Sequence, residues 1–301
     1  MHKLDWSDLQ YILAVSRNGS LAAAARELGV NHATVLRRIA KFEESHGTKL
    51  FDRLPQGYRL ARDHAHLLGN IDLIADQVAG ISRMITGETG GFQGTVHLTT
   101  TDTFCEVLMG RQISMFREAF PDVLPSLTVT NNRLDLARMD ADITIRPAKA
   151  LPDGFVGARV SDLAFGVYGA PEHGEREASE ALHHMSWVGG ADTLARSPAA
   201  EWITRHVPST QIVARADSFV AMSDLAANGV GLAMIPCCLG ETSGALAPVA
   251  SLKERPATGV WVAAHQDRAR SPRIQAFLDF LVESMVREAP LLAGQATGSE
   301  A

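Results

Sequence analysis

Residues 19–46 read GSLAAAARELGVNHATVLRRIAKFEESH, and this stretch decides the fold of the N-terminal part of the chain. Ser20 is a typical N-cap for the alanine-rich helix that follows it, and Gly29 ends that helix as a glycine often does. Asn31 then opens a second helix. The sequence therefore predicts two short helices joined by a tight turn, the arrangement of a helix-turn-helix.

The second helix has two different faces. Val35, Ile39 and Phe42 recur at helical spacing and are expected to face inward. The outward face carries Arg37 in its N-terminal half, which suits the major groove of DNA. An alanine-rich helix pair in an ordinary bundle is the alternative interpretation.

Residues 49–61 read KLFDRLPQGYRLA, two short extended runs around a Pro-Gln-Gly turn, and predict a β-hairpin. A hairpin beside a helix-turn-helix is a wing, and we expect Arg53 and Arg59 to contact phosphates without reading bases. Since Arg37 and Arg38 point about 100° apart, one is expected to contact DNA and the other to brace the wing. The candidate DNA-binding residues are Ser20, Asn31, His32, Thr34, Arg37, Arg38, Lys41, Arg53 and Arg59.

The net charge is unevenly distributed along the chain. Residues 1–61 hold nine Lys or Arg against six Asp or Glu, whereas the whole chain of 301 residues has a formal charge of −6. Only the N-terminal part is basic, as a DNA-binding domain requires. A composition of 46% hydrophobic and 21% charged residues is typical of a soluble protein with two or three domains. There is no apolar signal core or run of about 18 apolar residues, so we expect a cytoplasmic protein with no membrane partner.

Apolar residues after the wing follow spacings of four and three over about two and a half heptads. This heptad seam favours a coiled-coil partner, against the alternative of a helix packed on the core of its own chain. The candidate dimerisation residues are Leu67, Ile71, Ile74, Val78, Ile81 and Ile85. A homodimer doubles the contacts on a palindromic site, and the choice between a homodimer and a homotetramer stays open.

A glycine-rich segment, GETGGFQG at residues 87–94, marks a domain boundary, and the pattern changes after it. Strands alternating with helices predict a parallel α/β sheet. The expected strands are 95–100, 127–130, 141–145, 163–168, 211–214, 231–235 and 260–264. The expected helices are 104–120, 134–139, 199–206, 219–228 and 271–286.

Several of these motifs together resemble the LysR-type transcriptional regulators. Residues 6–60 contain DLQYILAVSRNGS, AAARELGV, IAKFEESHG and KLFDRLPQGYRL in the order of that family. The segments ADITIRP at 141–147, NGVGLAMIP at 228–236 and SPRIQAFL at 271–278 resemble its effector-binding region. Leu36 stands where the family usually has a small hydroxyl residue, and Leu60-Ala61 replaces its usual Leu-Thr.

The resemblance implies an α/β protein with an N-terminal winged helix-turn-helix, a linker helix and a two-subdomain effector region like the periplasmic solute-binding proteins. The winged helix-turn-helix DNA-binding domain is expected over 1–61, the linker (dimerisation) helix and hinge over 62–90, and the effector-binding region over 91–301. Within that region, subdomain I is expected at about 91–161 and 266–290, and subdomain II at about 162–265.

A ligand of this region is expected between the two subdomains, beyond the C-terminal ends of the strands, where helix N-termini present free N–H groups. Arg146 suits a carboxylate, whereas Asp102 argues against a simple anionic effector because it repels one. Helix capping and surface ion pairs are the alternatives for these residues. The candidate effector-binding residues are Thr100, Thr101, Asp102, Thr103, Arg146, Asp217 and Ser218.

Other groups of residues in the sequence give weaker indications of a functional site. Cys237 and Cys238 are interpreted as small core residues, with a redox pair as the alternative. The histidine pairs 64/66 and 183/184 lack companion ligands at metal-site spacing, so no metal or cofactor is expected. The chain contains no phosphate-binding loop, nucleophile elbow or acid–base pair, and we expect no catalytic residues.

These observations predict a cytoplasmic, sequence-specific DNA-binding regulator that responds to a small-molecule effector of unknown identity. The expected partners are double-stranded operator DNA, the effector and a second copy of the chain, with RNA polymerase as a further candidate. A solute-binding or interaction module without DNA binding, or an enzyme built on the α/β region, are the alternatives.

Overall fold

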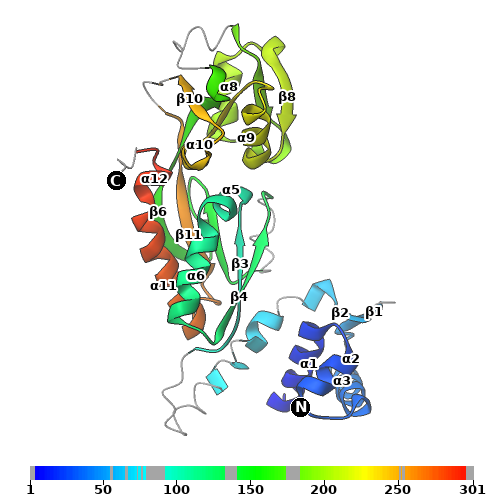
Figure 1. Ribbon diagram of the computed structural model, residues 1–301. Coiled ribbons are helices and arrows are strands. Elements are labelled where there is room, and N and C mark those ends of the chain that lie inside the picture. The colour runs from blue at the N-terminus through cyan, green and yellow to red at the C-terminus, as the bar shows by residue number, and fades with distance from the viewer. Residues whose placement is uncertain are drawn as a thin grey trace. The chain divides into compact units, whose positions relative to one another are not determined.

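The computed structural model describes residues 4–54, 57–64, 67–72, 92–132, 141–173, 184–250 and 255–295, together with positions 74, 75, 77, 78 and 252. The chain divides into two compact units, residues 1–90 and 91–301, each of which is described by itself. Figure 1 shows a small helical N-terminal unit and a larger unit built on a long sheet.

The N-terminal unit is a helix-turn-helix with a hairpin, as predicted. Its elements are α1 (Trp6–Asn18), α2 (Leu21–Glu27), α3 (His32–His46), β1 (Phe51–Leu54), β2 (Gly57–Leu60) and the 3₁₀ turn η1 (Arg62–His64). Ser20 caps α2 by accepting from the Ala23 N–H, and Asn31 caps α3 by accepting from the Ala33 N–H at 2.9 Å. Strands β1 and β2 pair antiparallel, so the predicted wing is present.

The wing is attached to the turn between α1 and α2 by one close backbone contact. The Tyr58 N–H donates to the Gly19 carbonyl oxygen at 2.8 Å. A Cβ atom on Gly57, whose φ is +138°, would lie 2.1 Å from that same oxygen. Glycine is therefore required at residue 57 both for its backbone conformation and for this contact.

The predicted dimer seam divides into two parts. Ile71, in a helical segment over residues 67–72, is 3% exposed and belongs to the core of its own N-terminal unit, against which Leu67 also packs. For these two residues the alternative of packing within one chain therefore describes the structure. Ile74 and Val78 are each 40% exposed. The candidate positions 81 and 85 lie outside the described residues.

The larger unit contains a nine-stranded sheet in the order β4-β3-β5-β11-β6-β9-β7-β8, with β10 paired to β6. The strands are β3 (Gly94–Thr100), β4 (Val123–Val129), β5 (Ile143–Pro147), β6 (Phe155–Gly169), β7 (Trp187–Gly190), β8 (Ile212–Ala216), β9 (Leu232–Pro236), β10 (Ala247–Ala250) and β11 (Ala257–His265). Seven of these strands match expected ones in position, whereas β7 and β10 were not predicted.

The sheet is mixed, so the expectation of a parallel sheet was wrong. β3 pairs parallel with β4 and β5, and β7 pairs parallel with β8 and β9. The long strand β6 pairs antiparallel with β9, β10 and β11. β6 carries the chain from one half of the sheet into the other, and β11 carries it back beside β6. Because the two neighbouring strands run in opposite directions, they pair antiparallel. The change of partners on β6, near Ala164, and the start of β11 at Ala257 mark the two crossings between the halves of the sheet.

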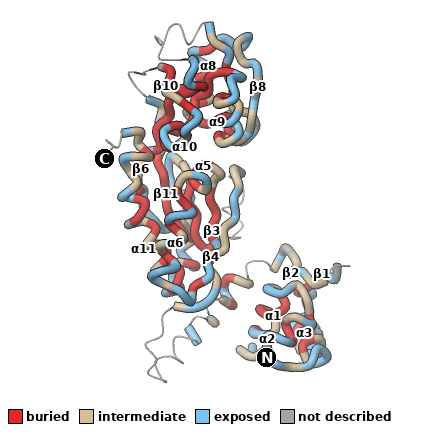
Figure 2. Tube along the Cα trace, in the orientation of Figure 1, coloured by how far each residue is buried: buried red, intermediate tan, exposed pale blue. Residues whose placement is uncertain are grey.

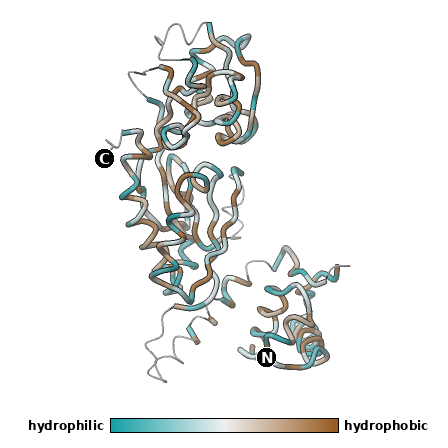
Figure 3. Tube along the Cα trace, viewed as in Figure 1, coloured by the Kyte–Doolittle hydropathy of each residue, from teal (hydrophilic) through white to brown (hydrophobic). Residues whose placement is uncertain are grey.

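Helices cover the sheet and complete one hydrophobic core (Figure 2). They are α5 (Asp102–Phe104), continued by the π-helical turn η2 (Cys105–Met109) and α6 (Gly110–Ala119), then α8 (Pro198–His206), α9 (Phe219–Ala227), α10 (Cys237–Thr242), α11 (Pro272–Arg287) and α12 (Ala289–Leu292). Short 3₁₀ turns are η4 (Pro171–His173), η5 (Asp192–Leu194) and η6 (Ser209–Gln211). The rings of Phe116 on α6 and Phe277 on α11 stack with centroids 3.5 Å apart, which joins these two helices. Figure 3 shows hydrophobic and hydrophilic residues alternating along α11, as an amphipathic helix requires. The helix expected over 134–139 falls outside the described residues.

Candidate functional site

The outward face of α3 is the polar surface predicted for DNA contact. Asn31, His32, Arg37 and Lys41 are exposed, and Thr34 is half-buried. Within the part of the chain that the structure describes, Arg37 and Lys41 make no hydrogen bond or ion pair. Their charges are therefore available to an external group.

Arg38 has a different role from its neighbour. Its Nη1 donates to Asp8 Oδ1 at 3.0 Å, and its guanidinium lies 5.6 Å from the centre of the Tyr11 ring. Both partners belong to α1. The expected difference between Arg37 and Arg38 is present, but Arg38 braces α1 rather than the wing.

The wing presents its two arginines to solvent. Arg53 and Arg59 are exposed, and the Arg53 guanidinium lies 5.7 Å from the centre of the Tyr58 ring. The Tyr58 ring also meets Phe51 edge to face. Leu36, the residue that departs from the family pattern, packs against the core of the unit, so an apolar side chain at this position has a structural role.

The larger unit contains a cavity of about 70 Å³ at the ends of several strands. Four of the seven candidate effector residues line it: Thr101, Asp102, Thr103 and Arg146. The other lining residues are Asn131, Pro147, Leu163, Phe165, Thr193, Leu194, Ser197, Pro198, Phe219 and Thr258. The cavity is therefore polar on the side of β3 and β5 and largely apolar elsewhere.

Asp102 is held at the start of the helix that follows β3. Its Oδ1 accepts from the Thr103 N–H at 2.6 Å, and its Oδ2 accepts from Asn131 Nδ2 at 2.9 Å. Asn131 follows β4, and its Oδ1 accepts from the Asp102 N–H at 3.3 Å. These reciprocal bonds fix the Asp102 carboxylate at the cavity wall.

Arg146 ends the buried part of β5 and is only 5% exposed. Its Nη1 donates to the Asn132 carbonyl oxygen at 3.1 Å, and its Nη2 donates to Thr99 Oγ1 at 3.0 Å. A buried guanidinium is costly unless it is hydrogen-bonded and neutralised, and these bonds also limit its orientation. Arg146 is therefore a positioned cation at one wall of the cavity.

Three candidate effector residues do not line the cavity. Thr100 is fully buried and donates from Oγ1 to the Ile145 carbonyl oxygen of the neighbouring strand at 3.2 Å. Ser218 caps α9 by accepting from the Ala221 N–H at 3.1 Å, which is the capping alternative. Asp217 is exposed, and its carbonyl oxygen accepts from Thr193 Oγ1 at 3.1 Å.

The wall expected from Asp217 and Ser218 is supplied by other residues. Ser197 caps α8, accepting from the Ala200 N–H at 3.1 Å, and Pro198 occupies the first turn of that helix. A serine followed by a proline is a recognised helix start, so this signal was available in the sequence. Asn131 was also missed, although it follows a strand adjacent to the one that precedes Asp102.

The cysteines are packed as core residues. Cys237 and Cys238 are fully buried, and burial raises the pKa of the Cys238 thiol to about 12. Burial also raises the pKa of Cys237, which lies 3.5 Å from Arg255 Nη1. Both side chains are therefore protonated thiols at neutral pH.

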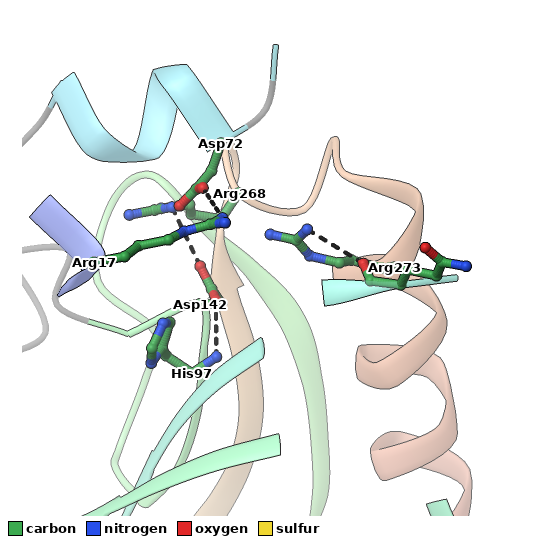
Figure 4. A network of polar contacts seen from close by, with 7 residues as sticks. Arg17, Asp72, His97, Asp142, Arg268 and Arg273 are labelled. Atoms are coloured by element: carbon green, nitrogen blue, oxygen red, sulfur yellow. Dashed lines mark hydrogen bonds and ion pairs between the residues drawn. The ribbon is translucent and has the colours of Figure 1, made fainter. Parts of the chain in front are cut away.

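Figure 4 shows a buried ion pair in the same unit, formed by two residues that do not line the cavity. Asp142 Oδ1 lies 3.3 Å from Arg268 Nη1, and Asp142 Oδ2 accepts from the His97 N–H at 2.8 Å. The two charged side chains are 5% and 10% exposed. The pair joins β3, the start of β5 and the segment after β11.

The described residues contain neither a membrane-spanning helix nor a cluster of metal ligands. None of their helices is long and apolar enough to cross a lipid bilayer. No three His, Cys, Asp or Glu side chains among them are grouped so that they would hold a metal ion.

Both units match known protein families. Residues 6–63 match the bacterial regulatory helix-turn-helix proteins of the lysR family, and residues 89–286 match the LysR substrate binding domain. The HTH-type transcriptional activator AmpR of Pseudomonas aeruginosa is 28% identical over 292 residues, which cover 92% of this chain and 94% of AmpR.

Solved structures share the fold. A full-length OxyR variant from Pseudomonas aeruginosa superposes with a TM-score of 0.73 at 16% identity, over 99% of this chain and 100% of OxyR. Full-length CbnR complexed with its target DNA gives a TM-score of 0.53 at 15% identity, over 94% of this chain and 100% of CbnR. The helix-turn-helix, the mixed α/β unit and the two family matches together show that this chain belongs to the LysR family of DNA-binding transcriptional regulators.

Proposed function

We propose that this regulator reads its operator through α3, with Arg37 and Lys41 in the major groove and the wing arginines Arg53 and Arg59 on phosphates. The observation that carries this proposal is the contrast between two adjacent arginines. Arg38 is engaged by Asp8 and Tyr11, whereas Arg37 is exposed and makes no bond within the described residues. Full-length CbnR, a protein of the same fold, is complexed with its target DNA, which supports DNA binding by this chain.

A binding-site selection from random double-stranded DNA, followed by anisotropy titrations of the full chain, tests the proposal. Arg37→Ala is expected to weaken specific binding by about 5- to 150-fold, equivalent to roughly 1–3 kcal/mol. Arg117→Ala removes an exposed helical arginine from the other unit and serves as the matched control. Equal affinity of the Arg37→Ala and Arg117→Ala variants for the selected operator would remove α3 from the interface.

The cavity beside Arg146 is the proposed effector site. It combines positioned polar groups with apolar walls, which is the usual composition of a small-molecule site. A ligand at 100 times its dissociation constant would stabilise the protein by roughly 2.7 kcal/mol, so a thermal-stabilisation screen of metabolites identifies it. Arg146→Ala and Thr101→Val should weaken effector binding and leave operator binding without effector unchanged. If both variants keep full effector affinity, the site lies elsewhere.

The regulator is further proposed to act as a homo-oligomer in the cytoplasm, without catalytic activity of its own. Ile74 and Val78, one helical turn apart, are exposed large apolar side chains in the N-terminal unit, and a second copy of the chain would cover them. Sedimentation of the full chain distinguishes a dimer from a tetramer. Because AmpR is a transcriptional activator, RNA polymerase is kept as a proposed partner.

A further inference from the structure

The charges on the described part of the cavity wall are balanced. Among the described residues that line the cavity, Asp102 is the one acidic side chain and Arg146 the one basic side chain. A purely anionic ligand would be attracted by Arg146 and repelled by Asp102. A purely cationic ligand would be attracted by Asp102 and repelled by Arg146. A ligand that carries both charges satisfies both residues.

The Asp102 carboxylate is bonded by neutral donors within the part of the chain that the structure describes. These donors are the Thr103 N–H at 2.6 Å, the Thr103 hydroxyl at 3.3 Å and Asn131 Nδ2 at 2.9 Å. The cap of the helix is provided by Thr101, whose hydroxyl oxygen accepts from the Phe104 N–H at 3.5 Å. The negative charge of Asp102 is therefore not required for capping, and it adds an anionic group to the cavity wall.

The remaining walls limit the size and polarity of the rest of the ligand. Leu163, Phe165 and Phe219 are apolar lining residues, and the cavity holds about 70 Å³. This space is small, so it suits a ligand of few heavy atoms. An α-amino acid with a short apolar side chain is a ligand of this kind.

We infer that the effector is a small zwitterion of the α-amino acid class, with its ammonium group at Asp102, its carboxylate at Arg146 and an apolar side chain against Phe165 and Phe219. This inference rests on the proposed effector role of the cavity. It specifies that both charges of the ligand are recognised, so removing either one from the ligand should weaken binding.

The test uses the full chain and three sets of probes, with affinity measured by calorimetry after a thermal-shift screen. The first set is the L-amino acids with short side chains, such as L-alanine and L-valine. The second set is their N-acetyl derivatives, which lack the ammonium charge, and the third is the matching 2-hydroxy acids, which keep the carboxylate alone. The variant is Asp102→Asn, which keeps an oxygen acceptor for the Thr103 N–H. Asp224→Asn, an exposed position on α9 outside the cavity, is the matched control.

The inference predicts that an L-amino acid binds roughly 10- to 100-fold more tightly than its N-acetyl derivative, the loss expected for a charged hydrogen bond. Asp102→Asn should abolish this preference, and Asp224→Asn should preserve it. The inference is overturned if no amino acid binds, or if the preference survives in Asp102→Asn. If a 2-hydroxy acid binds to the wild type and more tightly to Asp102→Asn, and Arg146→Ala weakens it, the cavity is an effector site for anions. The proposed function then stands and the zwitterion inference fails.

Discussion

Replacing Asp142 with Asn should destabilise the effector-binding unit strongly. The side chain keeps its shape and one oxygen for the His97 N–H, but the charge facing Arg268 at 3.3 Å disappears. Arg268 is 10% exposed, so water reaches it poorly after the change. Removing one partner of a buried ion pair costs about 3–5 kcal/mol, because the remaining charge stays buried and loses the carboxylate at 3.3 Å.

This loss corresponds to a fall in Tm of about 6–20 °C for a unit of this size. Urea denaturation followed by tryptophan fluorescence measures it, since Trp187, Trp202 and Trp261 all lie in this unit. Glu283→Gln is the control, because the Glu283–Arg287 pair on α11 has side chains that are 72% and 64% exposed. An exposed pair contributes at most about 1 kcal/mol. If Asp142→Asn unfolds within 1 kcal/mol of the wild type, the ion pair does not stabilise this unit in the way argued.

Three other outcomes are expected. Val78→Asp should dissociate the oligomer in sedimentation experiments while the fold is retained. Ile71→Ala should instead lower the stability of the N-terminal unit by about 2–5 kcal/mol, as a core truncation does. A reversed pattern would place Ile71 in the seam. Gly57→Ala should weaken operator binding in anisotropy titrations, because its Cβ would meet the Gly19 oxygen at 2.1 Å; full affinity would show that the wing position is unimportant. Cys238 should resist iodoacetamide at pH 7 and react only after unfolding. Its pKa is raised to about 12, and the reactive thiolate appears only as the pH approaches that value. Rapid labelling of the folded protein would contradict this.

The N-terminal unit was predictable because its signals are local. Ser20, Gly29 and Asn31 each determine a helix end within a few residues, and the structure uses all three in the expected way. The direction of the strands was not predictable by the same means. The pairing of β6 with β11 joins residues about a hundred positions apart, such as Ala164 and Ala257, and no short-range pattern encodes it.

The candidate effector residues were predictable only in part. Thr101, Asp102, Thr103 and Arg146 follow strand ends, and the rule that ligands bind there placed them correctly at the cavity. Ser218 also precedes a helix but is occupied as a cap. Capping and ligand binding use the same residue types at the same positions, so only the three-dimensional contacts separate them.

The long strand β6 changes its hydrogen-bonding partner along its length. Its residues 155–164 pair with β11, with a register shift between Arg159 and Ser161, and its residues 165–168 pair with β9. β11 and β9 lie on opposite sides of β6 in the sheet order, so neither of these two ladders runs along the whole strand. A rotation of the two halves of the sheet about the point near Ala164 would therefore break few hydrogen bonds between strands, which is what a hinge within this unit requires.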